Sequence, residues 1–304
     1  MDNYTNETKD WLDQRFRKTD RDGIYFAHQP IYGFRRGHSE PGIIVRYIIT
    51  RQIMKALAHL KFNSLLDVGG AEGYKAALAR SIFNVDVRSA DLSGEACRRA
   101  KEIYDIDGES IDIHKLHYHD NEFDVVLCSE TLEHVVDINE ATMELIRICS
   151  KAVVITVPHE PKHKIERNIR ENVPHAHLHS LDLSSFNFVL QVAQSVISRR
   201  MLNPLIVLIC KLADAVRKEK SEKHSQFVLS AFNLLVPVFR LVFTERVIRR
   251  LIEMDDWISN LIPSYSGMIF VILKDEKCYS ERPLRDISTS QITNFKVPYH
   301  YLVS

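Results

Sequence analysis

The sequence has no excess of charge of either sign: 40 lysines and arginines balance 40 aspartates and glutamates over 304 residues. A net charge of zero gives no electrostatic reason to expect nucleic acid as a partner, because nucleic-acid-binding proteins usually carry a surplus of basic residues. The N-terminal stretch is polar and charged and lacks the apolar core of a signal peptide. We therefore expect a cytoplasmic protein.

Cysteine is sparse, and internal repeats and low-complexity segments are absent. The five cysteines are scattered without a C-x-x-C pair: Cys97, Cys128, Cys149, Cys210 and Cys278. Because at least two of them lie in apolar runs, reduced thiols are favoured over a disulfide framework. The length and a hydrophobic content of 45% suffice for one large domain or a domain with an insertion.

The most informative stretch is LLDVGGAEG, residues 65–73. An apolar strand ends at Asp67 and runs into a turn that contains Gly69, Gly70 and Gly73, and a helix-like run follows. An open α/β sheet builds a ligand crevice at its carboxyl edge in this way. The alternative is an ordinary connection between a strand and a helix.

The turn lacks the glycine pattern of dinucleotide-binding sites and the ending of a phosphate-binding loop. The pattern G-x-G-x-x-G fails, since Ala71 and Tyr74 stand at its third and sixth positions, and no G-K-[S/T] follows. Glu72 within the turn and Asp67 before it would repel a pyrophosphate. A cationic cofactor without phosphate suits these carboxylates, and S-adenosylmethionine (SAM) carries an ammonium and a sulfonium.

Three further blocks follow in register: ADLS, NEFDVVLCSETLEHV and AVVITVPHE. With the first block they resemble the class I SAM-dependent methyltransferases, in particular the broad small-molecule branch, over roughly residues 62–158. Strands are expected near residues 64–68, 86–89, 110–113, 123–128 and 152–157, with helices between them, and a further helix is expected over residues 182–192. This alternation predicts a doubly wound α/β fold with a mostly parallel sheet. The resemblance implies a seven-stranded Rossmann-like sheet with an antiparallel last strand. Ala71 replaces a glycine that is usual in the family, so it must avoid a positive φ or accept strain.

The resemblance also implies cofactor contacts. Asp67 would lie near the methionine ammonium, Asp91 would accept both ribose hydroxyls, and Leu92 would pack on the adenine. Asp112 would accept from the adenine amino group. The other residues carried over are Gly69, Gly70, Gly73, Ile113, Ser129 and Glu130. For Asp67, capping of the turn is the alternative role.

The pattern E-x-x-E-H follows the fourth expected strand and offers Glu130, Glu133 and His134. On one helical turn these side chains would converge on one face, as ligands for a divalent ion. The same pattern occurs in ubiquinone-type O-methyltransferases and in small-RNA 2′-O-methyltransferases, but also in many relatives that need no metal. The alternative is that Glu133 and His134 brace the following helix.

Five of the 14 histidines lie within residues 158–180. His159, or one of His175, His177 and His179, is a candidate general base, because imidazole titrates near neutrality. One of them is also a candidate to complete the metal site. We take His134 and His159 as the catalytic candidates, with solvated surface histidines as the alternative.

The sequence divides into four regions. Residues 1–60 form an N-terminal arm and helix, 61–202 the SAM-binding core, 203–263 a helical insertion, and 264–304 the last core strand and a tail. We expect the arm, with Tyr25, His28, Tyr32 and Phe34, to close the site. The apolar stretches 204–212 and 227–243 of the insertion fall short of the roughly 20 apolar residues of a membrane span. The insertion is expected to be a helical lid or a homodimer face, with peripheral contact to a membrane as the alternative.

The predicted function is SAM-dependent methyl transfer to a hydroxyl of a small or lipid-like acceptor, with a divalent metal as an optional second cofactor. Metal-assisted 2′-O-methylation of RNA is one alternative, and the neutral charge weighs against it. The other is a SAM-binding fold that serves as an interaction module. The acidic residues Asp67, Asp91 and Glu130 argue against a cofactor site that has been lost.

Overall fold

The computed structural model describes residues 3–18, 42–171, 173, 175–217, 238–239 and 241–295. A seven-stranded sheet with the order β3-β2-β1-β4-β5-β7-β6 forms its centre. Strand β7 runs antiparallel to the six other strands of this sheet, which all run in one direction. The strands are β1 (Ser64–Val68), β2 (Asp86–Asp91), β3 (Gly108–Ser110), β4 (Phe123–Ser129), β5 (Cys149–Pro158), β6 (Ser195–Met201) and β7 (Gly267–Leu273). The predicted doubly wound, Rossmann-like sheet of seven strands, mostly parallel and with an antiparallel last strand, is confirmed.

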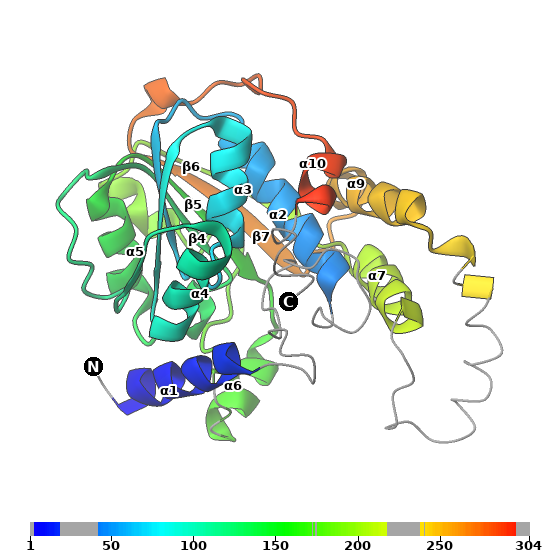
Figure 1. Ribbon diagram of the computed structural model, residues 1–304, viewed down its shortest axis with the longest axis horizontal. Helices are drawn as coiled ribbons and strands as arrows, with labels where there is room; N and C mark the ends of the chain where they lie inside the picture. The colour runs from blue at the N-terminus through cyan, green and yellow to red at the C-terminus, as the bar shows by residue number, and fades with distance from the viewer. Residues whose placement is uncertain are drawn as a thin grey trace.

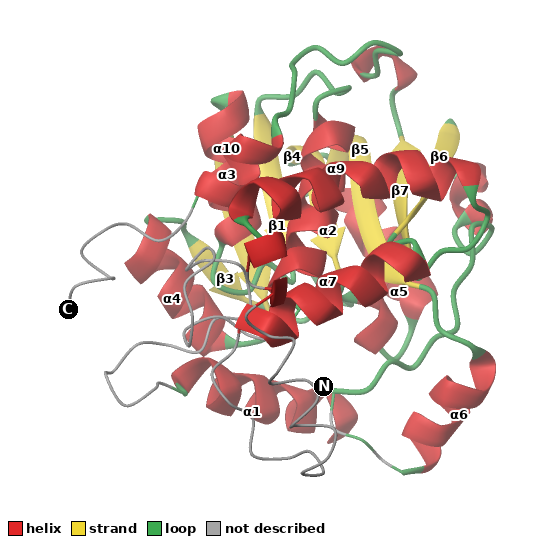
Figure 2. Ribbon diagram, turned by 90° about the vertical axis from the view of Figure 1, so that its right-hand side faces the viewer, coloured by secondary structure: helices red, strands yellow, loops and turns green. Residues whose placement is uncertain are grey.

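Helices cover both faces of the sheet (Figures 1 and 2). They are α1 (Asn3–Arg17), α2 (Ile43–Leu57), α3 (Tyr74–Phe83), α4 (Gly94–Tyr104), α5 (Ile138–Ile148), α6 (Lys162–Arg170), α7 (Pro204–Arg217), α9 (Glu245–Leu261) and α10 (Thr289–Asn294). Successive strand side chains point to opposite faces, so Leu65 joins a core with α2, α3, α7 and α9, whereas Leu66 joins a core with α5. Burial on both faces explains the nearly continuous apolar sequence of β4.

Two expected elements differ from the structure. The third strand ends at Ser110 rather than at Ile113, because an oxygen of Asp112 accepts the backbone N–H of His114 and turns the chain. The helix expected over residues 182–192 is a turn followed by a short 3₁₀ helix, Asn187–Gln191. There the Asp182 carboxylate accepts from the backbone N–H of Ser184, which favours a local turn over a helix.

The helical insertion packs directly on the core. Ile206 and Cys210 of α7 and Ile252 of α9 are buried in the same cluster as α2. Asp255 of α9 is fully buried and accepts from the backbone N–H groups of Leu202 and Asn203, at 3.0 and 2.8 Å. Residues 218–237, which include most of the second apolar stretch, lie outside the described residues.

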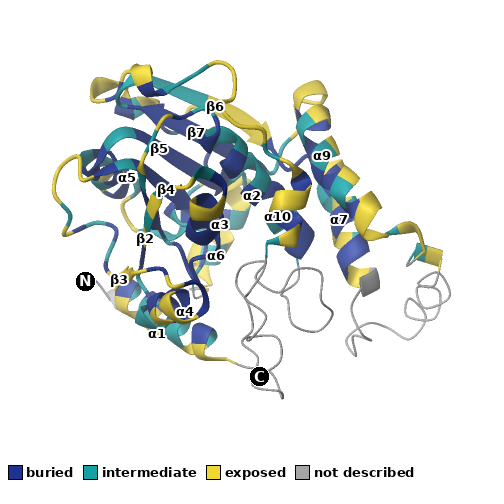
Figure 3. Ribbon diagram, turned by 45° about the horizontal axis from the view of Figure 1, so that its top comes forward, coloured by how far each residue is buried: buried dark blue, intermediate teal, exposed yellow. Residues whose placement is uncertain are grey.

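The outer faces of α7 and α9 are exposed, as Figure 3 shows, and they carry apolar side chains. Their large exposed side chains include Leu205, Leu208, Trp257 and Leu261. Within the described ranges, each helix is too short or too polar to cross a bilayer. Contact of this face with a membrane or a second copy stays a prediction.

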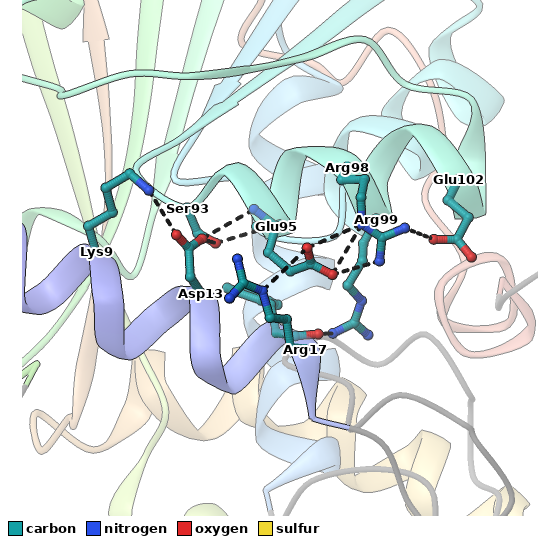
Figure 4. Close-up of polar contacts among 10 residues, drawn as sticks. Lys9, Asp13, Arg17, Ser93, Glu95, Arg98, Arg99 and Glu102 are labelled. Carbon is teal, nitrogen blue, oxygen red and sulfur yellow. Dashed lines mark hydrogen bonds and ion pairs between the residues drawn. The ribbon is translucent and has the colours of Figure 1, made fainter.

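Helix α1 lies beside α4 at the carboxyl edge of the sheet (Figure 1). Figure 4 shows the polar contacts that hold it: Asp13 accepts from Ser93 Oγ at 2.5 Å and from the backbone N–H of Glu95 at 3.2 Å. Arg99 of α4 is fully buried and donates to the backbone oxygen of Phe16. The arm residues Tyr25, His28, Tyr32 and Phe34 lie outside the described residues.

Candidate active site

A cavity of about 540 Å³ opens at the carboxyl ends of β1, β2 and β4. Helix α1 lines one side of it, with Leu12 and Phe16 among its contributions, and α2 and α7 line another. Seven of the predicted cofactor residues reach its wall: Gly69, Asp91, Leu92, Asp112, Ile113, Ser129 and Glu130. This volume lies within the range of about 300–1,000 Å³ that is typical of small-molecule sites.

The glycine turn after β1 has a backbone that few other residues tolerate. Gly69 has a φ of 73°, and a Cβ there would lie 2.1 Å from Thr131 Oγ1. Ala71 has a φ of 49°, so alanine accepts the left-handed conformation that the family usually gives to glycine. The backbone N–H of Ala71 donates to Asp91 Oδ2 at 3.0 Å, which ties the turn to the end of β2.

Asp91 is held in a fixed orientation by backbone donors. Its Oδ1 accepts from the N–H of Ser93 at 2.9 Å and its Oδ2 from that of Ala71. Burial raises the pKa of Asp91 to about 6, and these two hydrogen bonds oppose the shift. The carboxylate reaches the cavity, so its remaining lone pairs are placed to accept from hydroxyls of a ligand.

Three predicted cofactor residues, Asp67, Gly70 and Gly73, do not line the cavity. Asp67 is fully buried at the end of β1, and within the described chain neither of its carboxylate oxygens has a hydrogen-bond partner. Burial raises its pKa to about 6, while the nearby Lys75 ammonium acts in the opposite direction. Its predicted action on the cofactor therefore has to pass through the turn or through water.

A cluster of possible metal ligands faces the same cavity. Ligand atoms of Glu133, His134 and His177 all lie within 4.8 Å of one another. His134 Nδ1 lies 3.0 Å from the backbone oxygen of Ala176, and His177 Nδ1 lies 3.1 Å from Glu160 Oε2. His134 therefore donates through Nδ1 and keeps the lone pair of Nε2, the usual arrangement of a metal-bound imidazole. His177 Nδ1 lies within ion-pair distance of Glu160 Oε2, but that oxygen accepts no hydrogen bond in the described structure.

The charge state of this cluster also suits a cation. Burial and the neighbouring Glu130 raise the pKa of Glu133 well above its usual value. Burial, His175 and His177 lower the pKa of His134 well below its usual value. Glu133 Oε2 and Glu130 Oε1 are buried without a hydrogen-bond partner in the described structure. A divalent ion would supply the missing positive charge, so the residues present fit one.

The prediction that Glu130, Glu133 and His134 share one helical turn is wrong for Glu130. Glu130 precedes the short 3₁₀ helix, Leu132–His134, and has a φ of 56°. It lines the cavity but does not belong to the group of three close ligand atoms, where His177 takes its place. The strained backbone points to a functional constraint at this position.

The remaining candidate histidines divide into two kinds. His159 does not line the cavity; its Nδ1 lies 2.7 Å from the backbone oxygen of Leu181, so the structure does not support its predicted role as a base. His179 is likewise bonded to a backbone oxygen, that of Val135. His175 lies in a three-ring stack, with centroids 5.0 Å from Trp11 of α1 and 3.7 Å from His134.

Several lining residues were not predicted from the sequence. The cations Arg46, Lys75 and Lys211 line the cavity from α2, α3 and α7, and Leu12 and Phe16 line it from α1. Lys75 is the one with a local signal, since it follows the last glycine of the turn by two positions. For the others, only the folded arrangement brings them to the site.

Residues 66–156 match the family model described as a methyltransferase domain. No curated protein sequence matches the chain significantly. The family match therefore confirms the expected SAM-dependent methyltransferase domain over these residues, with SAM as its cofactor. The ubiquinone-type branch stays a prediction.

Solved structures share the fold at low identity. Geranyl diphosphate C-methyltransferase from Streptomyces coelicolor A3(2) has 14% identity and a TM-score of 0.53, covering 90% of this chain and 98% of its own. Phosphoethanolamine N-methyltransferase 2 from Haemonchus contortus has 17% identity and a TM-score of 0.50, covering 74% of this chain. The chain spans about half the length of the Haemonchus enzyme, 51% of it.

Proposed function

We propose that the protein transfers the methyl group of SAM to a hydroxyl of a small acceptor with an apolar portion, assisted by a divalent ion. One observation carries this proposal: the ligand cluster of Glu133, His134 and His177 faces the same cavity as Gly69 and Asp91. A cofactor held at the strand ends and an acceptor held at the cluster would therefore meet within one cavity.

The acceptor side of the cavity is chemically mixed. Val45 and Ile49 of α2 and Val207 of α7 give it apolar walls, and Arg46 and Lys211 add positive charge. The Streptomyces neighbour is described with Mg²⁺ and geranyl diphosphate, a ligand that joins an apolar chain to an anionic head. An amphipathic acceptor agrees with both observations.

The reaction is a displacement at carbon. An oxygen lone pair of the acceptor forms a bond to the methyl carbon, the bond from carbon to sulfur breaks, and its electron pair stays on sulfur. A divalent ion held by the cluster would act as a Lewis acid on the acceptor oxygen. Glu130 lines the cavity with a buried, unpartnered Oε1 in the described structure and is the candidate to accept the hydroxyl proton. Burial raises the pKa of Glu130, which suits a general base.

Calorimetric titration with SAM and S-adenosylhomocysteine, with and without Mn²⁺, tests the proposal, followed by transfer of labelled methyl groups to hydroxylated amphipathic acceptors. Asp91→Ala should abolish cofactor binding, and Glu133→Gln should abolish the dependence on metal while cofactor binding persists. Absence of SAM binding under every condition would reject the proposal. Transfer that is equal with Mn²⁺ and with chelator would reject the role of the ion.

RNA 2′-O-methylation is retained as a second candidate because His177 supplies a distal histidine beside E-x-x-E-H. The zero net charge of the protein still weighs against RNA as the acceptor. A short RNA with a free terminal ribose belongs in the same transfer assay. Methylation of that RNA but of none of the small acceptors would favour this second function.

A further inference from the structure

Lys75 is a buried cation that faces the cavity. It lies in the first turn of α3, is 4% exposed and contributes to the cavity wall. It donates no hydrogen bond and forms no close ion pair with any described residue, whereas buried ammonium groups are normally paired. A ligand that brings an anion to this position would satisfy it.

The surroundings of Lys75 locate that anion at the cofactor end of the cavity. Its charge acts on Asp67 more strongly than any other neighbouring charge does. Asp67 and Lys75 flank the same glycine turn, one at the end of β1 and the other at the start of α3. The first N–H groups of a helix have no partner within the helix, so those of α3 would also stabilise an anion bound beside Lys75.

The methionine end of SAM carries one ammonium and one carboxylate. We propose that Lys75 binds this carboxylate, so that Asp67 and Lys75 form a pair of opposite charges for the two charges of the amino-acid tail. The proposal rests on the proposed function, since it takes SAM as the cofactor. Arg46 and Lys211 come from α2 and α7, on the acceptor side, and are left for the acceptor.

The competing explanation is that Lys75 only neutralises the buried carboxylates around it. Its charge also acts on Glu130 and Glu133. In that case, removing it would change stability and metal binding, but it would not distinguish between nucleosides with and without a carboxylate. Binding of matched ligands therefore separates the two explanations.

The experiment measures the affinities of three ligands by calorimetry: S-adenosylhomocysteine, its decarboxylated analogue, and methylthioadenosine, which lacks the amino-acid tail. Lys75→Met should weaken S-adenosylhomocysteine by about ten- to a hundredfold, as expected for a charge-assisted hydrogen bond. It should leave the other two ligands within about twofold of the wild-type affinities. Lys211→Met, the same change at a lysine on the acceptor side, should leave all three unchanged.

Equal weakening of S-adenosylhomocysteine and its decarboxylated analogue by Lys75→Met would overturn the proposal, as would no change in either. Unchanged binding of methylthioadenosine shows that the variant is folded. If Lys75→Met does not fold, Lys75→Arg keeps the charge and should still bind S-adenosylhomocysteine more tightly than the decarboxylated analogue. Wild-type protein that binds none of the three ligands would reject the proposed function itself.

Discussion

Metal binding should release a proton from the buried cluster. The pKa of Glu133 is raised well above its usual value by burial and by Glu130, so the ligand-free cluster holds a proton that an ion must displace. While the pH stays below that raised pKa, the apparent affinity should rise about tenfold per pH unit, or about 1.4 kcal/mol. Affinity therefore increases as the pH rises, and becomes constant once the pH exceeds the pKa.

The geometry limits how far the ligands must move. Their atoms lie within 4.8 Å of one another, whereas bonds of about 2.1 Å place adjacent ligands of one ion roughly 3 Å apart. Side chains must close by roughly 1 to 2 Å, a movement within the reach of rotamer adjustment. The mixed imidazole and carboxylate set favours Mn²⁺ or Zn²⁺ over Mg²⁺.

Titration with Mn²⁺ in two buffers of different ionisation enthalpy, between about pH 6 and about pH 8, counts the released protons. We expect up to about one proton per ion while the pH lies below the raised pKa of Glu133, and fewer above it. Glu133→Gln should lose both binding and proton release, whereas Glu171→Gln, at an exposed glutamate after α6, should behave as wild type. Affinity that is independent of pH, with no proton released, would refute the raised pKa. Tight binding in Glu133→Gln would refute the ligand assignment.

Three further predictions concern stability and access. The pKa of Asp67 is about 6 in the folded protein against 3.8 ordinarily, so its ionisation should reduce the free energy of unfolding as the pH rises from about 4 to about 6. Asp67→Asn should remove on the order of 3 kcal/mol of that decline, measured by denaturation at both ends of the pH range. Equal declines in the wild type and the variant would contradict this prediction. Asp13→Ala, which loses the contacts to Ser93 and Glu95, should cost about 1–2 kcal/mol and speed the release of S-adenosylhomocysteine in stopped flow; an unchanged rate would mean that α1 is no barrier. If the outer face of α9 contacts membranes, Trp257→Gln should weaken sedimentation with anionic vesicles but not cofactor binding, and wild-type protein that stays in the supernatant would contradict that contact.

The sheet and the cofactor half of the site could be predicted because their signals are local. Polar residues stand at the ends of the expected strands, as Asp91 and Glu130 do, and parallel strands bring these ends to one edge. The helix expected over residues 182–192 failed because the side chain of Asp182 competes for backbone groups, which periodicity does not register.

The acceptor half depends on contacts between residues distant in sequence. His177 reaches the cluster because its loop returns to the 3₁₀ helix, where the backbone N–H of Leu178 donates to the oxygen of Glu133 at 2.7 Å. The sequence offers four neighbouring histidines as candidates to complete the metal site, and only this packing distinguishes His177 from His159. Helix α1 and the inner face of α7 likewise reach the cavity through tertiary packing alone.

The three-ring stack has a spectroscopic consequence. Trp11 is one of two tryptophans in the chain, and its ring lies 5.0 Å from His175, which in turn stacks on the cluster histidine His134. The other tryptophan, Trp257, is 64% exposed on α9. Trp11 is partly buried whereas Trp257 is exposed, so we expect the emission of Trp11 at the shorter wavelength. The emission of Trp11 thus gives a label-free optical record of whether α1 is seated on the site.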